Sequence, residues 1–361
     1  MGRFFEHIDW VSGILIICLS SFGLFLLLTI SQTLFFQQLL YLIFALVLLF
    51  IISQLDAVIL WWLAPFAYGS SIFFLILSYI GPSIRGAQRW IMIGPAQLQP
   101  SELVKPLLLL AFARFMSEYP PRTIKNVAIL SGLILIPFVL VFKQPDLGSS
   151  LVYAGFWLSM LLGAGFPVMI FALFMGIGGL LLPFAWHVLA QYQRDRILTF
   201  LHPSLDPKGA GYNALQAMIA VGSGEIFGRG LGRGTQSHLR FLPEFHTDFI
   251  FATLIEELGF VGGFVLMGGY ALLLWRIISP LVRGVVTDAF PFIYSVGLFA
   301  TILTQIFINT GMNMGLIPIT GITLPFVSYG GSSLLSLALS FGFLWALQGQ
   351  KRQAADIAFG R

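Results

Sequence analysis

The stretch Val11-Ser-Gly-Ile-Leu-Ile-Ile-Cys-Leu-Ser-Ser-Phe-Gly-Leu-Phe-Leu-Leu-Leu-Thr-Ile30 has no charged side chain and consists mostly of apolar residues. A helix needs roughly 20 mostly apolar residues to cross the hydrocarbon core of a bilayer, and this stretch has that length. Lipid offers no hydrogen-bond partners, so the backbone groups must pair within the segment, which requires a helix. The stretch shows no small-residue cleavage pattern, and we therefore interpret it as a first transmembrane helix rather than a signal peptide.

The rest of the chain has the same character. Of its 361 residues, 58% are hydrophobic and only 9% are charged, whereas a soluble domain carries about 25% charged residues. The apolar composition extends over the whole sequence, which excludes a soluble domain with a single membrane anchor. Cys18 is the only cysteine of the sequence, so no intrachain disulfide can form.

We predict an all-α integral membrane protein, with a single polytopic domain over residues 1–361 and about ten transmembrane helices. The predicted spans lie near residues 11–30, 36–53, 58–80, 102–118, 124–142, 149–163, 167–190, 250–275, 289–309 and 326–348. An even number of spans places both termini on one side of the membrane. The basic residues expected on that side are Arg3, Arg114, Arg122, Lys125, Arg276, Arg283, Lys351 and Arg352. The opposite short loops hold chiefly Arg85, Arg89 and Lys143. The positive-inside rule then places both termini in the cytoplasm.

A large extracytoplasmic loop, residues 191–249, is predicted between the seventh and eighth spans. Loops of this length usually have a function of their own. Its charged residues are Arg194, Arg196, Lys208, Arg229, Arg233 and Arg240, against Asp195, Asp206, Glu225, Glu244 and Asp248. This basic excess runs against the trend of the short loops. It indicates either an anionic ligand, such as a phosphate, or contact with lipid headgroups.

The end of this loop, Phe241-Leu-Pro-Glu-Phe-His-Thr-Asp248, is the part of the chain richest in groups that can carry chemistry. Glu244, His246 and Asp248 bring two carboxylates and an imidazole within five residues, a set that can transfer protons. Thr247 or Asp248 could instead cap the helix that follows, because their side-chain oxygens can accept from its unpaired N–H groups. Local sequence leaves both interpretations open.

The connection 81–101 leads into a second polar group. We expect Ser101 to cap the helix that starts there, and Glu102 to be favourable at its positive end. Lys105 lies one turn inside the membrane. It either snorkels back to the interface or projects as a cation into a cavity shared with the long loop, which Arg89 would also face.

Further polar groups are expected at the same face. Asp146 could make a turn and cap the next helix. Glu256 and Glu257 lie two turns inside a predicted span, and at least one should face the protein interior because a charge facing lipid is expensive. The stretch Asn309–Ser333 is rich in polar residues and glycine, which suits either backbone that lines a cavity or closely packed helices. Because all of these polar groups are expected at the same face of the membrane, the sequence predicts one site at the outer face.

Eight motifs then resemble those of the SEDS family (shape, elongation, division and sporulation), which contains RodA and FtsW. They are Gly86-Ala-Gln-Arg-Trp90, Gln99-Pro-Ser-Glu102 with Lys105, Gln144-Pro-Asp-Leu-Gly148, Asp206-Pro207 with residues 209–212, Ala220-Val-Gly-Ser-Gly224, Leu242-Pro-Glu with His246-Thr-Asp-Phe-Ile250, Glu256-Glu-Leu-Gly259, and Leu324-Pro with Ser328-Tyr-Gly-Gly-Ser332. They follow the family order from about residue 81 to 340. Within the family, Gly234-Thr-Gln-Ser237 resembles RodA more than FtsW.

The resemblance implies an enzyme that polymerises lipid II into glycan strands at the outer face of the bacterial cytoplasmic membrane, during cell-wall elongation. Asp248 matches the family's essential loop aspartate and would act as general base in an inverting reaction that releases undecaprenyl pyrophosphate. Cations would bind the substrate and meet the charge that develops on the pyrophosphate, the candidates being Arg89, Lys105, Arg194 and Arg196. The supporting positions are Trp90, Glu102, Asp146, Glu244, His246, Glu256, Glu257 and Ser328.

A divalent cation, Mg²⁺ or Mn²⁺, could share the leaving-group task, although the sequence has no recognisable metal-ligand spacing. The implied partners are lipid II, a class B penicillin-binding protein that cross-links the new strand, other elongation or division proteins and membrane lipids, but no nucleic acid. The alternatives are a lipid II flippase, the division-specific FtsW polymerase, and a structural protein that only recruits the cross-linking enzyme. A flippase needs a polar path across the whole bilayer, whereas the cytoplasmic half of the predicted helices is mostly apolar.

Overall fold

The computed structural model describes residues 8–82, 89–94, 96–189, 191–206, 209–239 and 241–358. Several residues that the sequence analysis singled out lie outside these ranges, namely Arg3, Arg85, residues 86–88, Pro207, Lys208 and Arg240. The side chains of Lys351 and Arg352 also lie outside the described part.

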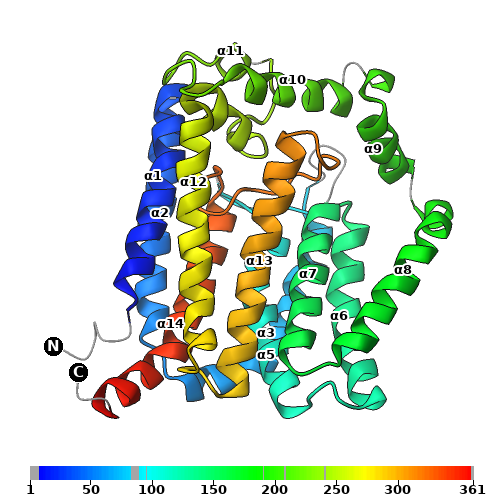
Figure 1. Ribbon diagram of the computed structural model, residues 1–361, viewed down its shortest axis with the longest axis vertical. Coiled ribbons are helices and arrows are strands. Elements are labelled where there is room, and N and C mark those ends of the chain that lie inside the picture. Colours follow the sequence, from blue (N-terminus) through cyan, green and yellow to red (C-terminus); the bar gives the residue numbers. More distant parts are fainter. Residues whose placement is uncertain are drawn as a thin grey trace.

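The described chain is predominantly helical (Figure 1). The first half contains α1 (Trp10–Ile30), α2 (Gln32–Ser53), α3 (Ala57–Leu77), η2 (Ser78–Ile80), α4 (Pro100–Leu103), α5 (Lys105–Glu118), α6 (Ile124–Lys143) and α7 (Leu147–Gly163). The second half contains α8 (Val168–Val188), α9 (Gln191–Leu201), η3 (Pro203–Leu205), α10 (Ala210–Ser223), α11 (Thr235–His238), α12 (Ile250–Val282), α13 (Ala289–Asn313) and α14 (Gly331–Ala358). Within the described ranges the only strands are β1 (Ile91–Ile93) and β2 (Ala96–Leu98), an antiparallel hairpin in the predicted loop 81–101.

A helix is present at each of the ten predicted positions. In the described part, seven are long and apolar enough to cross a membrane by length and composition, namely α1, α2, α3 with η2, α6, α12, α13 and α14. The apolar helix α7 is shorter, as is the first part of α8. Figure 1 shows α8 leaning away from the other long helices. Ten crossings therefore stay a prediction, whereas the helical class is confirmed.

Two predicted spans differ from the helices of the structure for a local reason. The span 102–118 is divided at Val104 into α4 and α5, because Pro106 in the first turn of α5 has no N–H to donate to the carbonyl of Glu102. That carbonyl accepts instead from Ser336 Oγ of α14 at 2.7 Å. The span 326–348 begins five residues late, at Gly331, because Phe326 has a positive φ of 65°, which a helix excludes.

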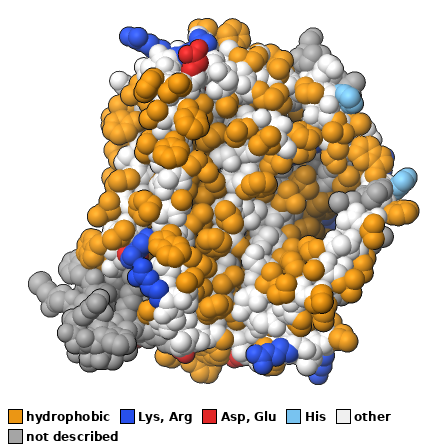
Figure 2. All heavy atoms as spheres, in the orientation of Figure 1, with side chains coloured by type: hydrophobic (Ala, Val, Ile, Leu, Met, Phe, Trp, Pro, Cys, Tyr) orange, Lys and Arg blue, Asp and Glu red, His pale blue; other side chains and the backbone are white. Residues whose placement is uncertain are grey.

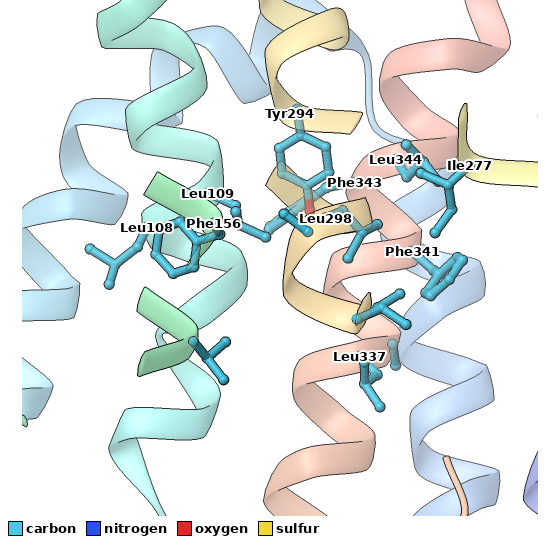
Figure 3. Close-up of a cluster of buried hydrophobic side chains, with 14 of the residues drawn as sticks. Leu108, Leu109, Phe156, Ile277, Tyr294, Leu298, Leu337, Phe341, Phe343 and Leu344 are labelled. Atoms are coloured by element: carbon cyan, nitrogen blue, oxygen red, sulfur yellow. The ribbon is translucent and has the colours of Figure 1, made fainter. Parts of the chain in front are cut away.

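The core lies where α5, α7, α12, α13 and α14 meet. Figure 3 shows Leu109 of α5, Phe156 of α7, Leu298 of α13 and Phe341 of α14 among its side chains, and these are buried. The outward faces are also apolar, as Figure 2 shows over most of the visible surface, with charged side chains mainly towards the two ends. A surface of this kind suits contact with lipid rather than water.

The segment 191–249 is more ordered than the long loop that the sequence predicts. It contains α9, α10 and α11, and Figure 1 shows α11 and α10 across the end of the bundle near α12 and α13, with α9 farther along towards α8. α10 packs against α12 and α13, so this layer is joined to the helices that carry Glu256, Glu257, Asn309 and Asn313. Of the charged residues predicted for this loop, Arg194, Asp195 and Arg196 lie on α9, whereas the others within the described ranges lie in the connections between helices.

Candidate functional site

Asp248 ends a tight turn that begins at Glu244. Glu244 has a positive φ of 53°, and its carbonyl accepts from the N–H groups of Thr247 and Asp248, both at 3.1 Å. The hydroxyl of Thr247 contacts the carbonyl and the carboxylate of Glu244, each at 3.2 Å. α12 has Phe249 at its cap position and no side-chain cap from that residue. Of the two capping residues that the sequence allows, Thr247 uses its hydroxyl inside the turn.

The backbone of Asp248 is held by two buried side chains of α13. Asn309 Nδ2 and Asn313 Nδ2 donate to the carbonyl oxygen of Asp248 at 2.9 and 3.0 Å. The carboxylate itself lies beside Gly321, because a Cβ added to that glycine would lie 3.4 Å from Asp248 Oδ2. Gly321 has a φ of 74°, a conformation that favours glycine. The side chain of Asp248 is half-buried at this position.

The turn before α14 supports the same segment. Ser328 Oγ donates to the carbonyl of Thr247 at 2.7 Å and accepts from the N–H of Leu324 at 2.8 Å. The N–H of Tyr329 donates to the carbonyl of His246 at 2.9 Å, and the two rings lie 5.6 Å apart. Ser328 and His246 therefore contribute to the path of the backbone on either side of Asp248.

Arg196 reaches the segment that borders Asp248. Its Nη1 donates to the carbonyl of Ile319 at 3.3 Å, two residues before Gly321. Arg196 and Ile319 line a solvent-open cleft between α9, α10 and the end of α13. The other lining residues are Thr199, Phe200, Pro203, Ala210, Ala214, Met218, Met312, Gly315 and Ile317. The cleft is thus apolar apart from a hydroxyl, backbone groups and one guanidinium.

The other predicted cations have different neighbours. Arg194 donates from Nη2 to the carbonyl of His187 at 3.0 Å, and its guanidinium lies over the ring of Trp186 at 6.0 Å, so it contacts α8. Arg89 and Trp90 are half-buried before β1. Within the described residues, Arg89 Nε is buried without a hydrogen-bond partner. Among the described residues, no hydrogen bond or ion pair joins Arg89 or Arg194 to Asp248.

Lys105 lies in a second polar cluster. Its Nζ lies 2.5 Å from Glu102 Oε1, and both side chains are buried. Asp146 accepts from Ser101 Oγ and from Gln99 Nε2, both at 2.9 Å. Lys105 therefore does not snorkel to the surface, and Ser101 does not cap its helix, because a carboxylate from α7 takes its hydroxyl. Asp146 caps α7 as predicted, accepting from the N–H of Ser149 at 3.0 Å.

The two clusters share the segment 319–333. Ser332 Oγ accepts from the N–H of Gln99 at 3.0 Å, and Thr323 Oγ1 lies 3.1 Å from Ser333 Oγ. The side chain of Ile322 packs against the first turn of α7, where a Cβ added to Gly148 would lie 2.5 Å from it. One chain segment thus lies between Asp248 and the Lys105 cluster, as the sequence predicts for a single face of the molecule.

Both glutamates inside α12 are buried, whereas the sequence predicts this for at least one of them. Glu256 accepts from the N–H of Gln236 at 2.9 Å and from Thr235 Oγ1 at 3.1 Å. Glu257 accepts from the N–H of Gly232 at 3.0 Å and pairs with His238 Nε2 at 2.9 Å. These contacts fasten the segment 232–238 to α12. The two carboxylates therefore stabilise the packing of this segment against α12.

α12 is also broken where these glutamates lie, since Gly259 has a φ of 68° and a ψ of −167°. The carbonyls freed by the break, those of Glu256 and Glu257, accept from the N–H groups of Arg229 and Gly230 at 2.9 and 3.0 Å. In the other direction, the N–H of Phe260 donates to the carbonyl of Glu225 at 2.9 Å. Backbone groups exposed by a break must find partners inside the protein when lipid surrounds it.

The match to known proteins agrees with this fold. A model of the FtsW, RodA and SpoVE family, described as cell cycle proteins, matches residues 3–353. The chain belongs to this family. The resemblance that the motifs indicate is thereby confirmed, and the apolar helices are those of a multi-pass membrane protein.

Two of the relatives below are named as peptidoglycan glycosyltransferases and one as a sporulation protein. The peptidoglycan glycosyltransferase MrdB of Escherichia coli K12 is 38% identical over 310 residues, which is 85% of this chain and 83% of MrdB. Stage V sporulation protein E of Bacillus subtilis is 38% identical over 283 residues, covering 75% of each chain. The probable peptidoglycan glycosyltransferase FtsW of Haemophilus influenzae is 35% identical, covering 81% of this chain and 74% of FtsW.

Solved structures match over nearly the whole chain. A chain from a peptidoglycan synthase complex that coordinates polymerization and crosslinking superposes with a TM-score of 0.83 at 31% identity, covering 96% of this chain and 98% of the other. Rod shape determining protein RodA of Thermus thermophilus superposes with a TM-score of 0.70 at 28% identity, covering 96% and 97%. The similarity to RodA agrees with the expectation from residues 234–237.

The structure of this family member adds residues that the sequence analysis did not assign to the site. Asn309 and Asn313 stood out only as part of a polar stretch, yet both hold Asp248. Their spacing of four residues places them on one face of a helix, and that signal was available. Among the described residues, no three His, Cys, Asp or Glu side chains lie together as a group that could hold a metal ion.

Proposed function

We propose that this protein is a peptidoglycan glycosyltransferase that polymerises lipid II at the outer face of the cytoplasmic membrane, with Asp248 as the general base. Membership in the family supports this proposal, together with the names of its relatives MrdB and FtsW. The observation that carries it is local: the carboxylate of Asp248 borders Gly321, and the same segment, at Ile319, lines a cleft that contains Arg196.

The proposed reaction needs one base and one stabilised leaving group. A hydroxyl of the acceptor sugar attacks the anomeric carbon of the donor, and Asp248 takes the hydroxyl proton as the new C–O bond forms. The bond from the anomeric carbon to the pyrophosphate oxygen breaks on the opposite side, so the configuration inverts. A half-buried carboxylate beside Gly321, two residues from the cleft-lining Ile319, suits this role, since a base must be within hydrogen-bond reach of the proton that it removes.

The departing undecaprenyl pyrophosphate carries the negative charge. A preorganised cation stabilises such charge most when it is already placed at the site. Arg196 is the first candidate, because its contact with Ile319 aims the guanidinium into the cleft. Lys105 would first have to leave Glu102, and Arg194 would have to leave Trp186. The apolar walls of the cleft are compatible with a polyprenyl chain next to its phosphate. Mg²⁺ or Mn²⁺ remains a proposal for the same task.

The proposed orientation puts the layer of α9, α10 and α11 outside the cell and both termini in the cytoplasm. The basic residues of the short connectors support this orientation by the positive-inside rule. We also propose that a class B penicillin-binding protein is the partner, since the similar chain in the peptidoglycan synthase complex acts where polymerization and crosslinking are coordinated.

The test uses purified full-length protein in detergent, with lipid II as substrate and glycan chain length as the readout. Wild-type protein should form long chains, alone or with the cross-linking partner, whereas Asp248→Asn and Asp248→Ala should form none. Asp195→Asn, which removes an exposed carboxylate of α9, is the matched control and should polymerise normally.

Polymerisation by Asp248→Asn at the wild-type rate would disprove the assigned mechanism. Transbilayer movement of lipid II in liposomes, without any polymer, would identify a flippase instead. The assay is repeated with EDTA and with added Mg²⁺ or Mn²⁺. A loss of polymer with EDTA that either cation restores would assign a metal to the leaving group.

A further inference from the structure

We propose that Asn309 and Asn313 are positioning residues of the reaction, which set the place of the general base through its backbone. This inference rests on the proposed role of Asp248. It assigns to α13 a part in the chemistry that neither its apolar character nor its position in the core suggests. Both asparagine side chains are fully buried, with an exposed fraction of 0%.

Asn309 joins the two sides of the site. Its Nδ2 donates to the carbonyl of Asp248 at 2.9 Å and to the carbonyl of Ile322 at 2.7 Å. An amide nitrogen has two hydrogens, so each can go to one of these carbonyls. The first carbonyl belongs to the base, and the second belongs to the segment that contains Ile319 and Gly321. The amide of Asn309 therefore sets how far the carboxylate lies from the cleft.

Asn313 holds the same carbonyl from one helical turn farther along. Its Nδ2 donates to Asp248 at 3.0 Å and to the carbonyl of Asn309 at 2.8 Å. Its Oδ1 accepts from the N–H of Ala252 at 3.1 Å. That N–H belongs to the first turn of α12, where it has no partner within its own helix. Asn313 thus caps the first turn of α12, and it links the start of α12 to Asp248.

Together the two buried side chains give the carbonyl of Asp248 two donors, one for each lone pair. A buried carbonyl without a donor would move towards another partner, because leaving it unpaired costs free energy. The carboxylate of Asp248 is separated from that carbonyl by a few bonds, so any movement of the peptide also moves the base. A displacement of about 1 Å can lower a catalysed rate by roughly 10²-fold.

The test compares three variants of the full-length protein in the lipid II assay. Asn309→Leu has a similar volume but no donor, and Asn309→Asp keeps the shape while replacing the donor with a carboxyl. Gln305→Leu is the matched control, because it removes another buried amide from the same helix one turn earlier. Initial rates are measured against lipid II concentration, and folding is checked by gel filtration and thermal unfolding.

We expect both Asn309 variants to lower kcat by roughly 10²-fold with KM within about threefold of wild type, since an interaction made only in the transition state affects kcat. Gln305→Leu should keep its kcat. The inference is overturned if the Asn309 variants match the wild-type kcat, or if KM rises while kcat stays the same. It is also overturned if both Asn309 variants fail to fold while Gln305→Leu folds, because the amide would then serve folding alone.

The outcome for Asp248 separates this inference from the function on which it rests. If Asp248→Asn is inactive and Asn309→Leu is fully active, the role of Asp248 as base is supported and the positioning role of Asn309 is overturned. If Asp248→Asn is fully active, the proposed mechanism fails, and a low kcat of Asn309→Leu would then overturn the assignment of Asn309 to this base.

Discussion

Lys105 and Glu102 form an ion pair inside the helical core, with side-chain exposures of only 2% and 6%. Each charge offsets the cost of removing the other from water, which explains why Lys105 can lie at membrane depth without reaching the interface. The nearby carboxylate of Asp146 is occupied by Ser101 and Gln99, so it leaves Glu102 as the partner of the lysine. Removing one charge of the pair should therefore change the free energy of unfolding measurably.

Glu102→Gln should lower the free energy of unfolding by about 3–5 kcal/mol, because it leaves a buried ammonium without a countercharge. The double variant Glu102→Gln with Lys105→Met should recover much of that loss, since neither charge then remains. Chemical or thermal unfolding in detergent measures both effects. The exposed pair of Arg114 and Glu118 is the control, and Glu118→Gln should cost less than about 1 kcal/mol. Equal losses in Glu102→Gln and Glu118→Gln would contradict the prediction.

Gly228 should not tolerate a side chain, because it lies where the segment 225–238 pairs with the broken part of α12. Its φ is 77°, and a Cβ would lie 2.2 Å from the carbonyl oxygen of Glu257. Gly284 has a similar φ of 70° with open space around it. Gly284→Ala should therefore show only the backbone cost of about 1–2 kcal/mol, whereas Gly228→Ala should cost clearly more.

The difference between the two alanine variants is read from unfolding midpoints in detergent. Gly228→Ala should also make the segment 225–238 more accessible to protease, since that segment pairs with α12 at this point. Similar midpoints for the two variants, with unchanged proteolysis, would show that the backbone around Gly228 can accommodate a methyl group.

Arg196 and Arg194 should differ in their effect on polymerisation. Arg196 lines the cleft beside the Asp248 segment, whereas Arg194 packs on Trp186 of α8. We expect Arg196→Ala to lower kcat/KM by roughly 10²-fold, as for the loss of one preorganised group at a developing charge. Arg194→Ala should have a much smaller effect. Rates with lipid II at low concentration give kcat/KM directly, and a larger loss in Arg194→Ala would reverse the assignment.

Much of the helical arrangement could be predicted from segments such as residues 11–30, because lipid allows a long apolar stretch only one backbone conformation. The interior position of Glu256 and Glu257 followed from the cost of a charge in lipid. The cap at Asp146 was also predictable, because the N–H that it accepts belongs to Ser149, three residues away. Each of these features depends on residues close together in the chain or on the solvent.

The same local reasoning failed for Ser101, Thr247 and Lys105. The hydroxyl of Ser101 is taken by Asp146, 45 residues away, and the first turn of α12 is capped by Asn313, 61 residues beyond Ala252. A capping rule counts only neighbours in sequence, so it cannot register a stronger or better placed partner from another helix. Lys105 has its partner three residues away, but its burial depends on the helices that pack against α5, namely α3, α7, α13 and α14.

For Asp248, the sequence by itself determined the residue type, its place before a long apolar helix and its match to a family motif. Only the tertiary structure decided what surrounds Asp248. Two amides from α13 donate to its carbonyl, and Gly321 lies beside its carboxylate. Arg196 donates to Ile319, in the same segment as Gly321. The physical reason is the range of the interactions. Burial in lipid acts on every residue of a stretch and can be read in order, whereas a hydrogen bond needs atoms about 3 Å apart, and only the packed helices bring those atoms together.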